Sequence, residues 1–225
     1  PPYCANFDPA NRPIKHRKDK ATEVIQNDNL SQAKYEEWLK AVLNNIISFL
    51  EESVASYLWN GYRQFGPMIQ ILIDFGFHVS SVITWVKPSI CLSFADYSFQ
   101  SEFCLYGWFK GKTAHKWFGL PGESNVWEVK RDNPNSLIHQ NQKPIELAQR
   151  AIKNSSVRGD VVLDIFLGSG STLIAAESLE RRCYGIEIEP KYVDAIVRRY
   201  IAFSGADKVS PEIRQRYLSE GGNNA

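Results

Sequence analysis

The chain has 225 residues, of which 44% are hydrophobic and 12% aromatic, and this is enough apolar material to bury one α/β core. No apolar stretch reaches the ~20 residues that a membrane-spanning helix requires. The 26 basic and 25 acidic residues leave a formal net charge of +1, so any nucleic-acid surface must come from the placement of charges rather than from their number. The four cysteines and four histidines show no metal-ligand spacing, and we therefore expect reduced thiols and no metal.

The first 30 residues predict an irregular segment. The chain opens with Pro1-Pro2-Tyr3, and residues 8–29 are polar and contain two further prolines. A basic cluster in this segment consists of Arg12, Lys15, Arg17, Lys18 and Lys20. A charge run is by default a solvated loop, and contact with phosphates is the alternative.

The middle of the chain predicts helices alternating with strands. Apolar residues at three- and four-residue steps indicate an amphipathic helix over residues 31–50, which Ser31 would cap. Further apolar runs predict strands over residues 54–59, 79–86 and 103–109 and a helix over 67–75 that Gly76 closes, with Pro88 ending the second strand. We assign Trp59 and Trp85 to the core.

The most informative segment begins with the apolar run at residues 161–163 and continues through Asp164 into a turn with Gly168, Ser169 and Gly170. A helix rich in Ala and Leu follows, and a strand–loop–helix unit of this kind holds nucleotide-like ligands in open α/β sheets. No lysine follows Gly170 and position 173 is Leu, so neither a P-loop nor the dinucleotide fingerprint is present. Adenosine without a pyrophosphate fits better, and an ordinary left-handed turn is the alternative.

An acidic residue follows the glycines at the spacing expected of a ribose ligand. Residues 183–188 predict the next strand, and Glu187 lies at its end. A carboxylate about 20 residues beyond the glycines can accept hydrogen bonds from the ribose hydroxyls. Helices are predicted to begin at Pro144 and Pro190, and residues 204–225 predict a partly ordered tail.

Four ordered blocks carry a resemblance to a known family. They are Pro1-Pro2-Tyr3, the run His139-Gln140-Asn141-Gln142-Lys143-Pro144, the loop from Asp164 to Thr172, and Tyr184-Gly185-Ile186-Glu187. Together they resemble the amino-group DNA methyltransferases of the permuted beta class, from Pro1 to about Tyr200. The resemblance implies an α/β, Rossmann-like, S-adenosylmethionine-dependent methyltransferase fold that is circularly permuted, with a mostly parallel sheet flanked by helices. Residues 1–203 would form the methyltransferase domain and residues 204–225 the tail.

The resemblance also assigns roles to residues. The catalytic positions would be Pro1, Pro2 and Tyr3, where the first proline offers its carbonyl and the tyrosine ring stacks on the base. The residues expected to hold S-adenosylmethionine are Lys143, Asp164, Phe166, Gly168, Ser169, Gly170, Thr172 and Glu187. The basic cluster, following directly on the catalytic motif, would contact DNA phosphates. Trp127 resembles part of a base-pocket block, although a buried strand tryptophan explains it equally well.

The function implied is transfer of a methyl group to the N6 amine of adenine in double-stranded DNA. The alternatives are cytosine-N4 methylation and a non-catalytic relic that binds DNA or a partner. In this family an Asp normally precedes the Pro-Pro-Tyr motif, and we expect the domain to be incomplete at its N-terminus and this fragment alone to be inactive. The resemblance further implies a bacterial or phage-encoded cytoplasmic protein without membrane association, and leaves open a cognate restriction nuclease and a homodimer.

Overall fold

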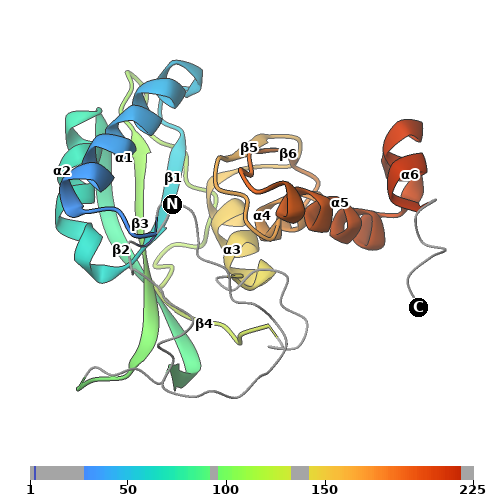
Figure 1. Ribbon diagram of the computed structural model, residues 1–225. Helices are drawn as coiled ribbons and strands as arrows, with labels where there is room; N and C mark the ends of the chain where they lie inside the picture. The colour runs from blue at the N-terminus through green and yellow to red at the C-terminus, as the bar shows by residue number, and fades with distance from the viewer. Residues whose placement is uncertain (1–2, 4–27, 92–95, 133–141, 219–225) are drawn as a thin grey trace. The chain divides into compact units, whose positions relative to one another are not determined.

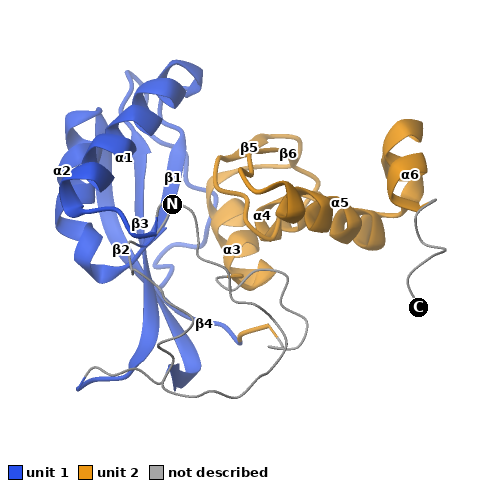
Figure 2. Cartoon of the chain, in the orientation of Figure 1, with its two compact units in different colours: residues 1–130 blue, residues 131–225 orange. Residues whose placement is uncertain are grey.

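The computed structural model describes residues 3, 28–91, 96–132 and 142–218. The chain divides into two compact units, residues 1–130 and 131–225 (Figure 2). Both units combine helices with strands, which confirms the α/β prediction. Among the described residues, no helix is both long and apolar enough to cross a bilayer.

Unit 1 is built on a four-stranded sheet in the order β1-β3-β2-β4. The strands are β1 (Ala55–Asn60), β2 (Phe77–Cys91), β3 (Phe99–Phe109) and β4 (Val126–Glu128). β3 is antiparallel to both β1 and β2, and only the β2–β4 pair is parallel. The prediction of a mostly parallel sheet is therefore wrong for this unit. Too few residues separate β2 from β3 for a crossover connection, and strands joined without a crossover pair antiparallel.

Two helices cover the sheet of unit 1 (Figure 1). α1 (Gln32–Ile46) continues into the short 3-10 helix η2 (Ile47–Phe49), and α2 (Phe65–Asp74) follows the 3-10 helix η3 (Tyr62–Gln64). The predicted cap is present, because the Ser31 side chain accepts a hydrogen bond from the amide of Lys34. Buried residues of both helices form one apolar cluster with residues from β2 and β3, namely Tyr35, Leu39, Leu43, Met68, Ile71, Leu72, Phe77 and Leu105.

Pro88 does not end its strand, contrary to the prediction, since β2 continues to Cys91. The register between β2 and β3 shifts between Val86 and Cys91, so Pro88 lies where the regular ladder is interrupted. Proline is tolerated at such a position because it removes no ladder hydrogen bond there.

Unit 2 contains the predicted strand–loop–helix unit. β5 (Val161–Asp164) leads through the glycine loop into α4 (Ser171–Ser178), and β6 (Arg182–Gly185) pairs with β5 in parallel. α3 (Ile145–Ser155) precedes β5, and its Ile152 packs with Ala175 and Ala176 of α4. α5 (Pro190–Ser204) follows β6. A crossover helix between β5 and β6 is the connection that parallel strands require.

Part of the predicted tail is helical. The 3-10 helix η5 (Ala206–Lys208) and α6 (Pro211–Leu218) follow α5. Tyr217 is only 6% exposed, its hydroxyl donates to Asp194 of α5, and its carbonyl accepts a hydrogen bond from Arg198. These contacts attach α6 to α5, and residues 219–225 lie outside the described residues.

Candidate functional site

The loop that follows β5 is joined by hydrogen bonds to the segment that follows β6. Asp164 accepts a hydrogen bond from the amide of Phe166 through its side chain (3.0 Å) and one from the amide of Ile186 through its carbonyl (2.9 Å). The amide of Leu167 in turn donates to the carbonyl of Ile186 (2.9 Å). The predicted residues Asp164 and Phe166 therefore lie in a loop whose course is fixed by backbone pairing.

The two glycines of the loop have different reasons to be glycine. Both adopt positive φ, 57° at Gly168 and 77° at Gly170, a region that side chains disfavour. A Cβ on Gly170 would lie 3.0 Å from Cγ2 of Ile196 on α5, whereas a Cβ on Gly168 would have nothing nearer than the carbonyl oxygen of Phe166 at 3.8 Å. Gly170 therefore allows α5 to pack closely, and Gly168 leaves open space beside the loop.

Glu187 closes this loop. Its Oε2 accepts a hydrogen bond from the amide of Gly168 (2.7 Å), and its Oε1 accepts one from the amide of Glu189 (2.9 Å). The sequence predicted Glu187 at the end of a strand over residues 183–188. The structure instead ends β6 at Gly185, so Glu187 lies two positions beyond the strand. An ionised carboxylate has about four lone-pair sites, so each oxygen retains capacity to accept from a ligand hydroxyl.

The start of α4 brings further predicted residues together. The hydroxyl of Ser171 donates to the carbonyl of Lys143 (2.7 Å), which places Lys143 next to the helix that also carries Thr172. Ser169, in contrast, is only 4% exposed, and its hydroxyl lies 3.3 Å from that of Ser171. Its side chain therefore faces the interior of the protein.

An arginine that the sequence analysis missed supports the same loop. Nη1 of Arg199 on α5 donates to the carbonyl of Ser169 (2.8 Å). Burial lowers the pKa of Arg199, and the charge of Asp132 acts in the opposite direction. In the sequence, Arg199 is a charged residue next to the apolar positions of a helix. Such a residue usually lies on the solvated face, so the pattern did not indicate a role in the loop.

These features fit the adenosine part of a nucleotide-like ligand. Gly168 offers an open backbone surface, and Glu187 offers carboxylate oxygens beside it. The neighbouring position Phe166 is half-buried and supplies an aromatic ring on the same loop. A group of His, Cys, Asp or Glu side chains able to hold a metal does not occur within the described part of the chain.

In unit 1, Tyr3 is held at both its backbone and its side chain. Its amide donates to Oδ1 of Asp28 (3.2 Å), and its hydroxyl donates to Oε2 of Glu102 on β3 (3.1 Å). Burial, followed by the charge and hydrogen bond of Glu102, raises the pKa of Tyr3 well above its usual value. The phenol therefore stays neutral across the physiological range.

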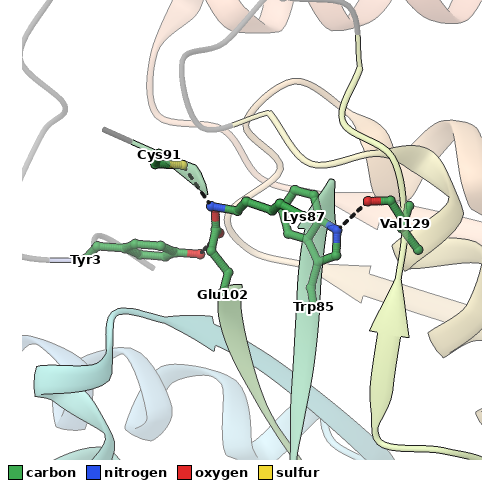
Figure 3. Close-up of polar contacts among 6 residues, drawn as sticks. All are labelled: Tyr3, Trp85, Lys87, Cys91, Glu102 and Val129. Atoms are coloured by element: carbon green, nitrogen blue, oxygen red, sulfur yellow. Dashed lines mark hydrogen bonds and ion pairs between the residues drawn. The ribbon is translucent and has the colours of Figure 1, made fainter. Parts of the chain in front are cut away.

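Glu102 is itself held by a buried lysine (Figure 3). Nζ of Lys87 on β2 lies 2.7 Å from Oε1 of Glu102, and Lys87 is only 5% exposed. The ammonium group also lies 3.6 Å from Sγ of Cys91 and 5.3 Å from the ring centroid of Trp85. The sequence analysis missed both charged residues, although each interrupts an apolar strand segment, which is the signal that could have revealed them.

Trp127 belongs to the core of unit 1. It is 2% exposed on β4, its Nε1 donates to the carbonyl of Ser124 (3.0 Å), and its ring packs 6.5 Å from that of Trp59. Trp85 is also buried, and its Nε1 donates to the carbonyl of Val129 (2.8 Å). The interpretation of Trp127 as a buried strand residue is therefore confirmed.

Several predicted residues lie outside the residues that the structure describes. They are Pro1 and Pro2 of the catalytic motif, the run from His139 to Asn141, and the basic cluster of Arg12, Lys15, Arg17, Lys18 and Lys20.

Comparison with known families and sequences gives one family and several relatives. The family described as DNA methylase, N6_N4_Mtase, matches residues 1–198. The Type II methyltransferase M.HpaI of Haemophilus parainfluenzae is 28% identical over 210 residues, which cover 84% of this chain and 67% of that protein. M2.MboI of Moraxella bovis is 31% identical over 144 residues, which cover 58% of this chain and 53% of that protein. The chain thus spans about half to two thirds of the length of these relatives.

Solved structures agree with the sequence relatives. The M1.HpyAVI–SAM complex has a TM-score of 0.65 and 25% identity over 74% of this chain and 83% of that chain. PvuII DNA methyltransferase, described as cytosine-N4-specific, has a TM-score of 0.66 and 19% identity over 90% of this chain and 83% of that chain. The α/β arrangement is therefore that of the S-adenosylmethionine-dependent DNA methyltransferases.

Proposed function

Because the chain belongs to the DNA methylase family of N6 and N4 amino-group methyltransferases, we propose that it transfers a methyl group from S-adenosylmethionine to the N6 amine of adenine in DNA. The observation that carries this proposal is the closure of the glycine loop by Glu187, with an open surface at Gly168. The Pro-Pro-Tyr motif is compatible with adenine and with cytosine. Adenine is proposed because Asp is the usual residue before this motif in the family that the chain resembles.

On the cofactor side, the proposed residues would bind S-adenosylmethionine and orient it. Bound S-adenosylmethionine supplies an electrophilic methyl group on a sulfonium centre. Glu187 would accept hydrogen bonds from the ribose hydroxyls through its remaining lone pairs, while Asp164 keeps the loop in place through the amide of Phe166. Lys143, Gly168, Gly170 and Thr172 would line the same site, and Ser169 would act through the loop backbone because its side chain is buried.

On the base side, Tyr3 would stack on the target base after it has left the duplex. An exocyclic amine is a weak nucleophile because its lone pair is conjugated into the ring, so alignment with the methyl group contributes much of the rate. The carbonyl of Pro1 would accept a hydrogen bond from the amine, and Pro2 would keep the motif rigid because proline fixes φ. The neutral phenol of Tyr3 suits stacking, since no charge has to be desolvated.

Double-stranded DNA is the proposed partner. The basic cluster of residues 12–20 would contact phosphates, which position the duplex without reading its sequence. The relatives named above are Type II methyltransferases, and a restriction nuclease of matching specificity is proposed on that ground. We also propose that two copies of the chain associate as a homodimer.

Calorimetric titration of S-adenosylmethionine tests the cofactor assignment. Glu187→Ala removes the acceptors proposed for the ribose hydroxyls and the partner of the Gly168 amide, so we expect binding to weaken by roughly 1–3 kcal/mol. Glu146→Ala is the matched control, because this exposed glutamate lies in the first turn of α3 in the same unit. Equal affinity of the Glu187 variant and the control would remove the ribose assignment.

A further inference from the structure

Tyr3, Glu102 and Lys87 form a continuous polar chain, here called the Tyr3 network. The Tyr3 hydroxyl donates to one oxygen of Glu102 (3.1 Å), and the other oxygen pairs with the Lys87 ammonium (2.7 Å) (Figure 3). The three residues come from the start of the chain, from β3 and from β2. The network therefore connects the residue proposed for the base to the middle of the sheet in unit 1.

Stability alone does not explain a lysine that is only 5% exposed in this network. A buried ion pair loses hydration that its Coulomb attraction only partly restores, and apolar residues of similar volume are often equally stable. The pair does fix the orientation of the Glu102 carboxylate, because each of its oxygens has its own partner. Gln100 of β3 adds to this order, since its side-chain amide donates to the carbonyl of Lys87 (3.0 Å).

The ring of Tyr3 is thereby held at both ends. Its amide is bound to the buried carboxylate of Asp28, its carbonyl lies against Gly61, and its hydroxyl is bound to Glu102. A ring fixed at its backbone and at its para position has little rotational freedom left to lose when a base stacks on it. Preorganisation of this kind raises the rate of a reaction that depends on alignment.

We propose that Glu102, oriented by Lys87, is a positioning residue that fixes the Tyr3 ring in the attitude in which it receives the target base. This inference rests on the proposed function, because it concerns the base side of the same reaction. Glu102 would act through Tyr3, without contact to the methyl group or the amine. Lys87 acts one step further back by holding the carboxylate of Glu102.

A matched pair of variants isolates the acceptor of the Tyr3 hydroxyl, in protein extended so that the expected Asp precedes Pro1, because the fragment alone is expected to be inactive. Lys87→Met with Glu102→Gln removes both charges and keeps an amide oxygen that can accept from Tyr3, whereas Lys87→Met with Glu102→Ala removes the acceptor as well. We expect the Gln variant to retain a higher kcat for methyl transfer to DNA than the Ala variant, because only the Gln side chain can accept from the Tyr3 hydroxyl. The Ala variant should lose about tenfold in kcat, the scale of a small misalignment, with KM for S-adenosylmethionine unchanged.

Combining the variants with Tyr3→Phe tests whether Glu102 acts through the Tyr3 hydroxyl or through a general effect on the structure. In a Tyr3→Phe background the two variants should have equal kcat, because the hydroxyl that distinguishes them is gone. Tyr3→Phe alone should also lose about tenfold in kcat, and this conservative variant covers the case in which the Lys87 variants fail to fold. Glu128→Gln, an exposed glutamate on β4 of the same sheet, is the charge-matched control.

A second readout does not depend on activity. In protein labelled with carbon-13 at the tyrosine ζ carbon, the signal that Tyr3→Phe removes should titrate at a lower pH in Glu102→Gln than in the unsubstituted protein. Full kcat in Tyr3→Phe, a Gln–Ala difference that persists in the Phe background, or an unchanged Tyr3 titration would each overturn the positioning role. Absence of methyl transfer by a protein in which the expected Asp precedes Pro1 would overturn the proposed function, with an altered Tyr3 titration still showing that the network exists.

Discussion

The reactivity of the Cys183 thiol on β6 depends on its burial and on the nearby charge of Asp164. Burial, with a smaller contribution from the charge of Asp164, raises the pKa of the Cys183 thiol to about 12. A raised thiol pKa means that the neutral form persists as the pH rises, and that the reactive thiolate appears only near pH 12. At pH 8 the thiolate fraction should be lower than that of an ordinary cysteine by about a thousandfold.

We therefore expect Cys183 to be alkylated far more slowly at pH 8 than the same cysteine in the unfolded protein. Mass spectrometry of peptides after timed alkylation measures this difference. Asp164→Asn should accelerate the reaction of Cys183 modestly, because it removes the second cause of the shift. Equal alkylation rates in the folded and unfolded protein would contradict the burial of this thiol.

At the residue scale, local spacing and the family resemblance predicted residues that the structure places around one loop. Asp164, Gly168, Glu187 and Lys143 were all predicted, and the structure brings them around one loop. The contact between Tyr3 and Glu102 joins residues 99 positions apart, and no periodicity in a single sequence reports such a pairing. Arg199 was missed for the same reason, since it acts on a loop 30 positions away.

At the scale of elements, the loop between β5 and α4 separates two kinds of glycine. Gly170→Ala combines a positive φ of 77° with a Cβ 3.0 Å from Ile196, so we expect the free energy of unfolding to fall by about 1–3 kcal/mol. Gly168→Ala has open space around it and should cost only about 1 kcal/mol of strain. Its larger effect should be on S-adenosylmethionine affinity, because the added methyl group occupies the proposed ligand surface.

Denaturant unfolding of both variants measures the loss of stability, and calorimetric titration measures their affinity for S-adenosylmethionine. Gly159→Ala is the control for strain alone, since Gly159 has a φ of 87° and no neighbour within 4 Å of an added Cβ. A Gly168 variant that binds the cofactor like the control would show that this glycine does not face the ligand.

The ends of two strands could not be predicted from the local sequence. Pro88 was expected to end a strand, yet β2 passes through it at a register shift that only the pairing with β3 creates. The strand after the glycine loop ends at Gly185 because its pairing with β5 ends at Asp164, and this leaves Glu187 free of the ladder. In both cases the partner strand, rather than the local sequence, sets the boundary.

At the scale of the whole molecule, unit 1 carries the base-side residue Tyr3 and unit 2 carries the loop assigned to the cofactor. The α/β class and the family were predictable, because four ordered blocks cover most of the chain and the family matches residues 1–198. The antiparallel pairing of β3 with β1 and β2 was not, since strand direction depends on connections whose geometry the sequence pattern does not specify. The circular permutation remains a prediction.

Transfer of labelled methyl groups from S-adenosylmethionine to DNA, followed by digestion to nucleosides and their separation, identifies the base that the protein methylates. In a protein extended so that the expected Asp precedes Pro1, we expect label in N6-methyladenine, with the rate strongly reduced in Glu187→Ala and unchanged in Glu146→Ala. Label in N4-methylcytosine would contradict the assignment of the base and leave the methyltransferase function intact. If that extended protein binds DNA but transfers no methyl group to any base, the proposed function itself is contradicted.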